Sequence, residues 1–279
     1  MTDPTVAIAL GAGGVRGLAH VHALGALDDL GVKPVAIAGT SIGALMGAAY
    51  ASGMSGAEIQ AYADERFRDR FQLLARLWKL RPDSVRQFIA DGGPRLGEIV
   101  IERVFDLFLP PEIADDFSDL QIPLQVVATD YYAHRDRVFR SGPLRPTLAA
   151  SAAMPAVFRP VVIEGDVFID GGITNPVPFD LLVGMADIVV GIDVTGNPRG
   201  IPGKRPNKVD VLYASSQLMQ QSITRGKTER HPVDILLPAD VSAFRVLDFL
   251  KTRTVLETTA PLRDDLKKAL SKAIEARSK

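Results

Sequence analysis

The run Ile37–Gly43, IAGTSIG, carries a Gly-x-Ser-x-Gly pentapeptide between an apolar stretch and an Ala/Leu-rich helical pattern. We expect a strand over Pro34–Ala38 and a helix over Ile42–Ser52, so that Ser41 stands on a strand-to-helix turn. A serine on such a turn is raised for nucleophilic attack, and the flanking glycines allow the tight bend. The run therefore predicts a catalytic serine, whereas in the plainer alternative Ser41 only caps its helix.

The composition is compatible with an enzyme and excludes several other classes. The 279 residues include 32 Lys and Arg against 33 Asp and Glu, so no net field favours nucleic acid. Cysteine is absent, which removes disulfides, thiolate nucleophiles and most zinc sites. The N-terminal MTDPTVAIAL is unlike a secretion signal, and no apolar run approaches the roughly 18–20 residues that span a bilayer. We expect a cytoplasmic protein, and peripheral contact with a membrane is compatible with the sequence.

Short β-branched runs alternate with helical patterns along the chain. The expected strands are Thr5–Leu10, Pro34–Ala38, Leu124–Thr129, Arg137–Arg140, Val161–Glu164, Val167–Ile169, Ile188–Val194 and Val233–Leu236. The expected helices are Leu18–Leu30, Ile42–Ser52, Gly56–Leu80, Leu96–Phe108, Thr147–Ala153, Val177–Gly184, Lys208–Thr228 and Thr254–Arg277. Several strands are apolar on both faces, as in a sheet covered on both sides. The alternation predicts an α/β fold, a three-layer αβα sandwich around a mainly parallel central sheet.

The chain is expected to form a single domain over residues 1–279. Residues 197–207, NPRGIPGKRPN, are typical of an exposed loop that follows a motif-bearing core of about residues 5–195. Residues 205–279 form a mostly helical C-terminal extension. The expected strand at 233–236 indicates that the sheet continues beyond the loop.

A glycine-rich loop, Gly11–Gly17 (GAGGVRG), lies between the first expected strand and the first expected helix. Consecutive glycines at a helix N-terminus expose backbone N–H groups and form an anion site. A dinucleotide fingerprint fits poorly, because Arg16 stands where the third glycine belongs and no acidic residue ends the second strand. An oxyanion hole fits better, since parallel strands bring this loop and Ser41 to the same edge. A plain tight turn remains the structural alternative.

A serine nucleophile needs a base, and the four histidines offer little. His20 and His22 lie two apart in the first helix, so they point in different directions, and both precede Ser41. His134 sits in a polar turn. His231 is the only histidine in the Ser-Asp-His order of common esterases, and it remains an alternative base.

A carboxylate is the stronger base candidate. Asp170 ends an expected strand and is followed by Gly171 and Gly172, which let the chain turn sharply toward another loop. An aspartate within hydrogen-bond reach of a serine can accept its proton. In the structural alternative, Asp170 only caps an Asp-Gly turn.

Taken together, these motifs resemble the patatin-like phospholipase family of serine acyl hydrolases. The resemblance spans roughly residues 5–195 and leaves the C-terminal extension without a recognised motif. The residues that carry it are Gly11-x-Gly13-Gly14-x-Arg16-Gly17, Gly39-x-Ser41-x-Gly43, Ala150–Pro160 (ASAAMPAVFRP), Asp170-Gly171-Gly172 and Asn175-Pro176.

The resemblance implies a Ser41–Asp170 dyad without a catalytic histidine, metal or cofactor. It implies an oxyanion hole formed by the backbone of Gly11, Gly13 and Gly14, of which the last two lie nearest the chemistry, while Arg16 braces the loop. The implied activity is hydrolysis of phospholipid or lysophospholipid esters through an acyl-enzyme. A non-enzymatic adaptor that keeps the fold is the alternative. The supporting residues are Gly39, Gly43, Gly171 and Gly172.

Residues 64–81, DERFRDRFQLLARLWKLR, place Phe67, Phe71, Leu74 and Trp78 at helical spacing among basic residues. A basic amphipathic helix with an aromatic stripe can lie in a lipid interface. In the commoner alternative the stripe packs on the core and the charges face water. This segment is where we expect any peripheral membrane contact.

Overall fold

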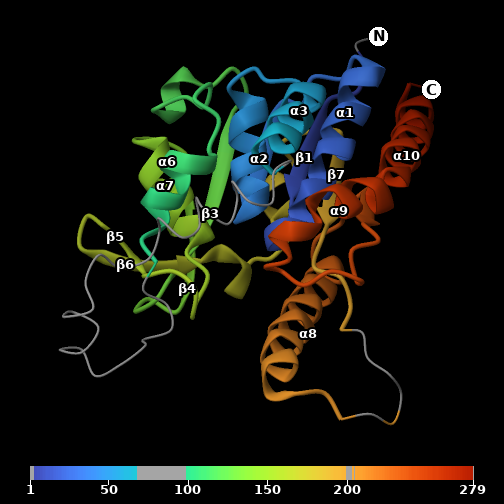
Figure 1. Ribbon diagram of the computed structural model, residues 1–279. Helices are drawn as coiled ribbons and strands as arrows, with labels where there is room; N and C mark the ends of the chain where they lie inside the picture. Colours follow the sequence, from blue (N-terminus) through green and yellow to red (C-terminus); the bar gives the residue numbers. More distant parts are fainter. Residues whose placement is uncertain (1–2, 68–98, 199–202, 204, 279) are drawn as a thin grey trace, which may run out of the picture.

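The computed structural model describes residues 3–67, 99–198, 203 and 205–278. A mixed sheet lies at the centre of these residues, with helices packed around it (Figure 1). Its strands are β1 Val6–Leu10, β2 Ala36–Thr40, β3 Leu124–Asp130, β4 Arg135–Phe139, β5 Val161–Ile163, β6 Asp166–Asp170, β7 Ile188–Asp193 and β8 Ile235–Pro238. Each of the expected strands is present, with ends displaced by at most two residues.

The strand order is β5-β6-β3-β2-β1-β7-β8, and β4 pairs with β3 beside this path. The run β3-β2-β1-β7-β8 is parallel, whereas β4, β5 and β6 pair in antiparallel fashion. Leu10 at the end of β1 pairs with Gly39 near the end of β2, so the loops that follow these strands begin side by side. Ligand sites of parallel sheets form at this carboxyl edge.

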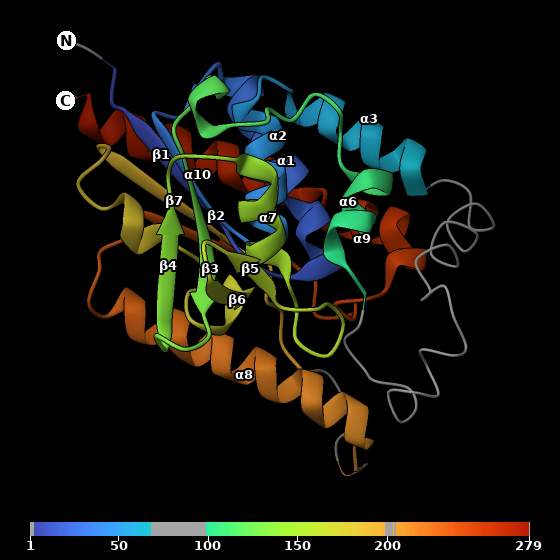
Figure 2. The ribbon, with the colours of Figure 1, turned by 90° about the vertical axis from the view of Figure 1, so that its left-hand side faces the viewer.

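Helices cover one face of the sheet (Figure 2). They are α1 His20–Leu30, α2 Ile42–Ala51, α3 Gly56–Phe67, α6 Ile101–Phe108, α7 Leu144–Ala152, α9 Thr252–Thr259 and α10 Pro261–Arg277. Helix α8 Lys208–Thr228 lies apart from this layer, beneath the sheet (Figure 1). Short 3-10 turns are η1 Gly14–Ala19, η2 Phe117–Asp119, η3 Gly171–Ile173, η4 Phe179–Leu182 and η5 Phe249–Lys251. The expected helices Gly56–Leu80 and Leu96–Phe108 run partly outside the described residues.

Prolines explain two expectations that are wrong. The expected helix Val177–Gly184 is only the 3-10 turn η4, which begins after Pro178, because a proline disfavours the helical conformation for the residue before it, here Val177. The expected helix Thr254–Arg277 is divided at Ala260, where Pro261 begins α10 as its first residue.

The two faces of β1 differ in size of side chain and therefore in what covers them. Ile8 and Leu10 belong to the large core that includes α1, α2, α7 and α10. Ala7 and Ala9 belong to a smaller core in which Phe179 of η4 packs on the other face. The small alanines let this irregular segment approach the sheet closely. The α/β fold class is confirmed, with a thin layer on the η4 side.

The C-terminal extension completes the sheet and the helical layer. β8 pairs in parallel with β7, and α10 packs on α1. Arg263 of α10 forms an ion pair with Asp29 at 2.7 Å. Because these residues share the central sheet and the large core with the motif-bearing part, we propose that the described residues form one domain.

Because α2 crosses β1 closely, substitution of two helical glycines by alanine should have opposite effects on stability. A β-carbon at Gly43 in α2 would overlap the carbonyl oxygen of Leu10, whereas one at Gly226 in α8 meets nothing closer than 3.6 Å. We expect Gly43→Ala to lower the free energy of unfolding by about 2 kcal/mol or more. Gly226→Ala should raise it by about 0.5–1 kcal/mol, because alanine is the better helix former.

Urea denaturation of both variants measures these changes. An unchanged midpoint for Gly43→Ala would show that α2 can move away from β1 at little cost.

Candidate active site

Ser41 occupies the sharp turn between β2 and α2. Its backbone has φ 55° and ψ −124°, a strained conformation for a residue with a side chain. The side chain does not cap α2 and is only 5% exposed. The alternative in which Ser41 merely caps a helix is therefore wrong. The turn aims the hydroxyl away from α2, toward the end of β6.

The hydroxyl of Ser41 meets the carboxylate of Asp170. Ser41 Oγ donates a hydrogen bond to Asp170 Oδ2 at 2.6 Å. The second carboxylate oxygen, Oδ1, accepts the N–H of Gly172 at 2.7 Å, which fixes the orientation of the group. Asp170 is the last residue of β6 and is 7% exposed. The pair thus joins two buried side chains that are 129 residues apart in the chain.

The C-terminal end of α7 positions both members of the pair. Ser151 Oγ accepts the N–H of Ser41 at 2.9 Å and donates to the carbonyl oxygen of Val127 in β3. Two residues later, the carbonyl oxygen of Ala153 accepts the N–H of Asp170 at 2.9 Å. The sequence motifs include this segment but predict no role for it. Its run of small residues, ASAA, indicates close packing, and Ser151 and Ala153 are indeed fully buried.

Burial controls the acidity of Asp170. Removal from water raises the pKa of this carboxyl from 3.8 to about 6, although hydrogen bonds from Ser41 and Gly172 favour the charged form. A carboxylate with a pKa near 6 is mostly ionised at neutral pH and is a stronger proton acceptor than an ordinary aspartate. This property suits a general base.

The glycine-rich loop uses some of its amides and leaves others free. The N–H of Gly11 donates to the carbonyl oxygen of Ile192 at 3.0 Å, so the expected contribution of Gly11 to an oxyanion hole is wrong. Within the described part of the chain, no acceptor is hydrogen-bonded to the N–H of Gly13 or Gly14. Gly14 has φ 58° and borders the same pocket as Ser41. Among the described residues, two amides of this loop are therefore without an acceptor, and Gly14 borders the pocket that contains Ser41.

Arg16 holds the glycine-rich loop from behind. The side chain is 1% exposed, and its Nε donates to the carbonyl oxygen of Gly13 at 3.2 Å while Nη1 donates to that of Thr195. Burial lowers its pKa to about 10, so it stays charged at neutral pH. His20 Nε2 also supports the loop, since it donates to the carbonyl oxygen of Gly11 at 2.8 Å. We propose on these contacts that the arginine braces the loop.

The remaining glycines of the motifs lie where backbone segments cross. Gly39 of β2 touches the start of α2, and Gly171 lies against the carbonyl group of Val127. A β-carbon at Gly172 would lie 2.9 Å from the Cβ of Ala12. The aspartate turn and the glycine-rich loop are thus in direct contact.

The histidines do not reach this pair. His22 Nε2 is hydrogen-bonded to the carbonyl oxygen of Leu256, and burial lowers the pKa of His20 to about 4. His134 and His231 are exposed. No histidine is hydrogen-bonded to the serine or the aspartate, so the geometry gives His231 no support as the base. In the described residues, no three His, Asp or Glu side chains are arranged as metal ligands.

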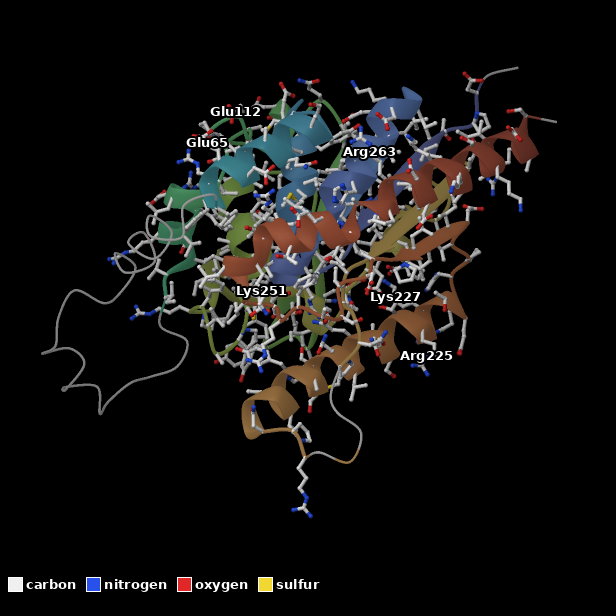
Figure 3. All side chains as sticks on the ribbon, turned by 45° about the vertical axis from the view of Figure 1, so that its right-hand side comes forward. Glu65, Glu112, Arg225, Lys227, Lys251 and Arg263 are labelled. Carbon is white, nitrogen blue, oxygen red and sulfur yellow. The ribbon has the colours of Figure 1, made fainter. Side chains whose placement is uncertain are left out.

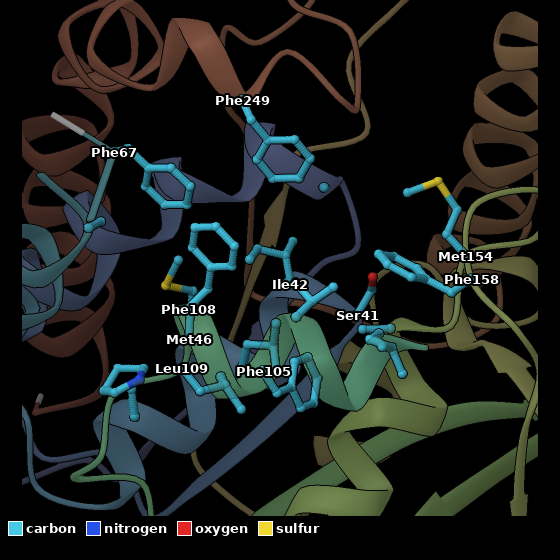
Figure 4. A pocket seen from close by; sticks show the side chains of 18 of the residues that line it. Ser41, Ile42, Met46, Phe67, Phe105, Phe108, Leu109, Met154, Phe158 and Phe249 are labelled. Atoms are coloured by element: carbon cyan, nitrogen blue, oxygen red, sulfur yellow. The ribbon is translucent and has the colours of Figure 1, made fainter. Parts of the chain in front are cut away.

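An apolar pocket of about 350 Å³ begins at Ser41 (Figure 4). Successive turns of α2 form one wall, and α3, α6 and residues 152–158 form the others. Aliphatic and aromatic side chains dominate the lining, which suits an acyl chain and offers few partners to a dinucleotide. The residues labelled in the figure are Ser41, Ile42, Met46, Phe67, Phe105, Phe108, Leu109, Met154, Phe158 and Phe249.

A buried lysine that sequence reasoning missed lies behind the pair. Lys227 Nζ of α8 donates to Asn175 Oδ1 at 2.5 Å and forms an ion pair with Asp180. The backbone carbonyl oxygen of Asn175 accepts a hydrogen bond from the hydroxyl of Thr40, the residue before the serine. Nothing in the sequence distinguishes Lys227 from the other lysines of the C-terminal extension, because its partners come from a distant loop.

The expected aromatic stripe of residues 64–81 is described only at its start. Phe67 ends α3 and stacks on Phe108 at 5.5 Å between ring centroids, in the wall of the pocket. Phe71, Leu74 and Trp78 lie outside the described residues. No helix in the described part of the chain is both long and apolar enough to cross a membrane.

Comparisons with known proteins identify the family of the chain. The sequence model of the family described as Patatin-like phospholipase matches residues 8–183. An uncharacterised NTE family protein of Mycobacterium tuberculosis is 34% identical over 200 residues, which make up 71% of this chain and 51% of that protein. Human patatin-like phospholipase domain-containing protein 6 is 32% identical over 200 residues, or 70% of this chain and 14% of that protein. The chain thus matches about half the length of the mycobacterial relative.

A solved structure, VipD from Legionella pneumophila, has a TM-score of 0.53 and 13% identity to this chain. The match covers 98% of this chain and 67% of VipD. At this level of identity the likeness concerns the fold.

The raised pKa of Asp170 predicts how stability depends on pH. An acid with a raised pKa binds its proton more tightly in the folded state, so folding is disfavoured as the pH rises through 4 to 6. Asp170→Asn removes this cost and keeps an acceptor for Gly172. We expect it to raise the free energy of unfolding at pH 8 by on the order of 1–3 kcal/mol.

The gain should shrink as the pH falls from 6 to 4, where the unsubstituted carboxyl becomes protonated. Chemical denaturation of both proteins at pH 8 and pH 4.5 measures the two differences. A variant that is less stable than the unsubstituted chain at pH 8 would contradict the expectation.

Proposed function

The chain belongs to the patatin-like phospholipase family, and we propose that it is a serine acyl hydrolase that cleaves fatty-acyl esters of phospholipids or lysophospholipids. The observation that carries the proposal is the hydrogen bond between Ser41 and Asp170 at the end of an apolar pocket. The family match covers the residues that form this pair.

In the first step Ser41 attacks the ester carbonyl carbon while Asp170 accepts the hydroxyl proton. The negative charge that develops on the carbonyl oxygen is stabilised by the free amides of Gly13 and Gly14. A well-placed donor of this kind contributes about 3–4 kcal/mol. Collapse of the tetrahedral intermediate breaks the ester bond, and Asp170 returns the proton to the departing alcohol oxygen.

In the second step water hydrolyses the acyl-enzyme. Asp170 takes a proton from the water, whose oxygen attacks the acyl carbonyl carbon in front of the same two amides. The fatty acid then leaves and Ser41 recovers its proton. The single carboxylate acts as base and acid in turn, so this scheme needs no histidine.

The shape of the pocket supports one direction for the acyl chain. Ser41, Leu45 and Ala49 lie on successive turns of α2 along its wall. The rise of 1.5 Å per residue places Ala49 about 12 Å from the serine along the helix axis. A fatty acyl chain bound there would lie beside α2, with its carbonyl group at Ser41 and its methyl end near α3.

Substitution of the pair tests the activity. We expect Ser41→Ala and Asp170→Asn to reduce kcat/KM for a p-nitrophenyl acyl ester by at least about a thousandfold, because each removes a group that acts on the reacting atoms. Ser41→Ala should also abolish labelling by a fluorophosphonate. His231→Ala serves as the matched control and should keep full activity.

Loss of activity in His231→Ala with retention in Asp170→Ala would favour a Ser-His-Asp esterase. A folded protein that cleaves no ester and resists labelling would favour the adaptor alternative.

Bulk at the far end of the pocket should change chain-length selectivity. Ala49 is buried and borders empty pocket space, so Ala49→Phe would occupy the room needed by a long chain. We expect kcat/KM for a palmitoyl ester to fall at least about tenfold, and that for a butyryl ester to stay within about twofold. Ala49→Ser, which adds little volume, is the control. Equal loss on both esters would place the acyl chain elsewhere.

A further inference from the structure

Helix α8 presents apolar side chains to the solvent. Val211 is 47% exposed, Leu212 64%, Leu218 55% and Met219 59%. The pairs repeat after seven residues, so all four project from one side of the helix. We call these four residues the α8 stripe. Residues 211–224, which contain it, carry no charge in the sequence.

Two glutamines of α8 point the other way, toward the protein. Gln217 Nε2 donates to the carbonyl oxygen of Thr195 at 3.0 Å, and Gln221 Nε2 donates to that of Gly196 at 2.6 Å. Lys227 is buried on the same side. A helix that faces water shows the opposite pattern, with its apolar side inward. The outer face of α8 therefore matches an apolar environment.

The α8 stripe lies close to the site of the reaction. α8 runs beneath the edge of the sheet where β1 and β2 end (Figure 1), and it packs against η3, the turn that follows Asp170. A β-carbon at Gly172 would lie 3.1 Å from Gln220 Nε2. The loop before η5 adds Leu247, which lines the acyl pocket and is 36% exposed.

We propose that the α8 stripe docks on an anionic phospholipid surface and brings the mouth of the acyl pocket to the lipid. The proposal rests on the proposed function, which requires a substrate that resides in such a surface. Exposed arginines near both ends of the helix, Arg205 three residues before it and Arg225 in its last turn, supply the matching charge. Figure 3 shows Arg225 at the outer side of α8, where its guanidinium can reach headgroup phosphates while the stripe enters the acyl region.

The size of the stripe disfavours a second copy of the chain as its partner. Four half-exposed side chains present on the order of a few hundred Å² of apolar surface. A stable dimer buries about 800 Å² on each partner. A helix that binds at a lipid interface needs less apolar area, because lipids surround its apolar side and the basic residues add electrostatic attraction. The surface thus fits a bilayer better than a subunit.

A binding experiment in the Ser41→Ala background tests docking apart from catalysis. Vesicles of phosphatidylcholine, alone or with about one third phosphatidylglycerol, are sedimented with the full chain carrying Leu218→Asp and Met219→Asp. Each added carboxylate would have to enter the apolar region, so we expect the bound fraction on the anionic vesicles to fall at least about tenfold.

The matched control places two aspartates at half-exposed apolar positions away from α8. Val35 and Val183 are 40% and 39% exposed. Val35→Asp with Val183→Asp adds the same charge and should leave vesicle binding unchanged. Both double variants should keep the unfolding midpoint of the Ser41→Ala protein, because all four side chains are exposed.

Activity measurements on the chain with Ser41 intact separate docking from chemistry. The α8 double variant should lose hydrolysis of vesicle phospholipid in proportion to binding, while its kcat/KM for a soluble butyryl ester stays within about twofold. If the Ser41→Ala protein binds vesicles through α8 but the intact chain cleaves no ester, the proposed function fails and the docking surface stands.

Equal vesicle binding by the α8 variant and its control would overturn the inference, as would no vesicle binding by the Ser41→Ala protein. Analytical ultracentrifugation checks the rival partner. A dimer that the α8 substitutions dissociate would assign the stripe to a second copy instead.

Discussion

The hydrogen bond from Ser41 to Asp170 exists only because three backbone segments approach one another more closely than ordinary side chains permit. Gly43 lies against the carbonyl oxygen of Leu10, and Gly171 lies against that of Val127. Larger residues at either glycine would push β1, α2 or η3 outward and separate the hydroxyl from the carboxylate. The motif glycines are therefore a geometric requirement of the dyad, and the parallel register of β1 with β2 places the crossing at one edge.

This arrangement places unfavourable features together at the site. Ser41 holds a positive φ, and Asp170 is a buried carboxylate stabilised by hydrogen bonds, with burial raising its pKa. Such features destabilise a fold and persist where the surroundings hold them in place. Here the surroundings are the end of α7 and the buried Arg16, which fix the backbone on both sides of the pair. The strain and the raised pKa suit the roles of nucleophile and base that we propose for Ser41 and Asp170.

The sequence predicted the strands, the serine turn and the aspartate at the end of β6, because each depends on local pattern and glycine chemistry. It failed where distant partners decide the outcome. Gly11 lost its free amide to Ile192, a residue of β7 far along the chain. Lys227 is buried against the loop that carries Asn175, and no local sequence pattern predicts this burial. Local rules could have found the break at Pro261, since proline removes a helix donor.

Helix α8 shows why the residues beyond the family match cannot be treated as an appendage. Its inner side joins Lys227 to Asn175, and the backbone carbonyl oxygen of Asn175 holds Thr40, directly before Ser41. Polar groups are needed on that side because the backbone carbonyls it covers would otherwise lack donors. With its polar residues turned inward, the helix has only apolar side chains and serines left for much of its outer side. The same inversion that secures the back of the dyad thus creates the surface that we assign to lipid, so support of the site and access to substrate are coupled in one helix.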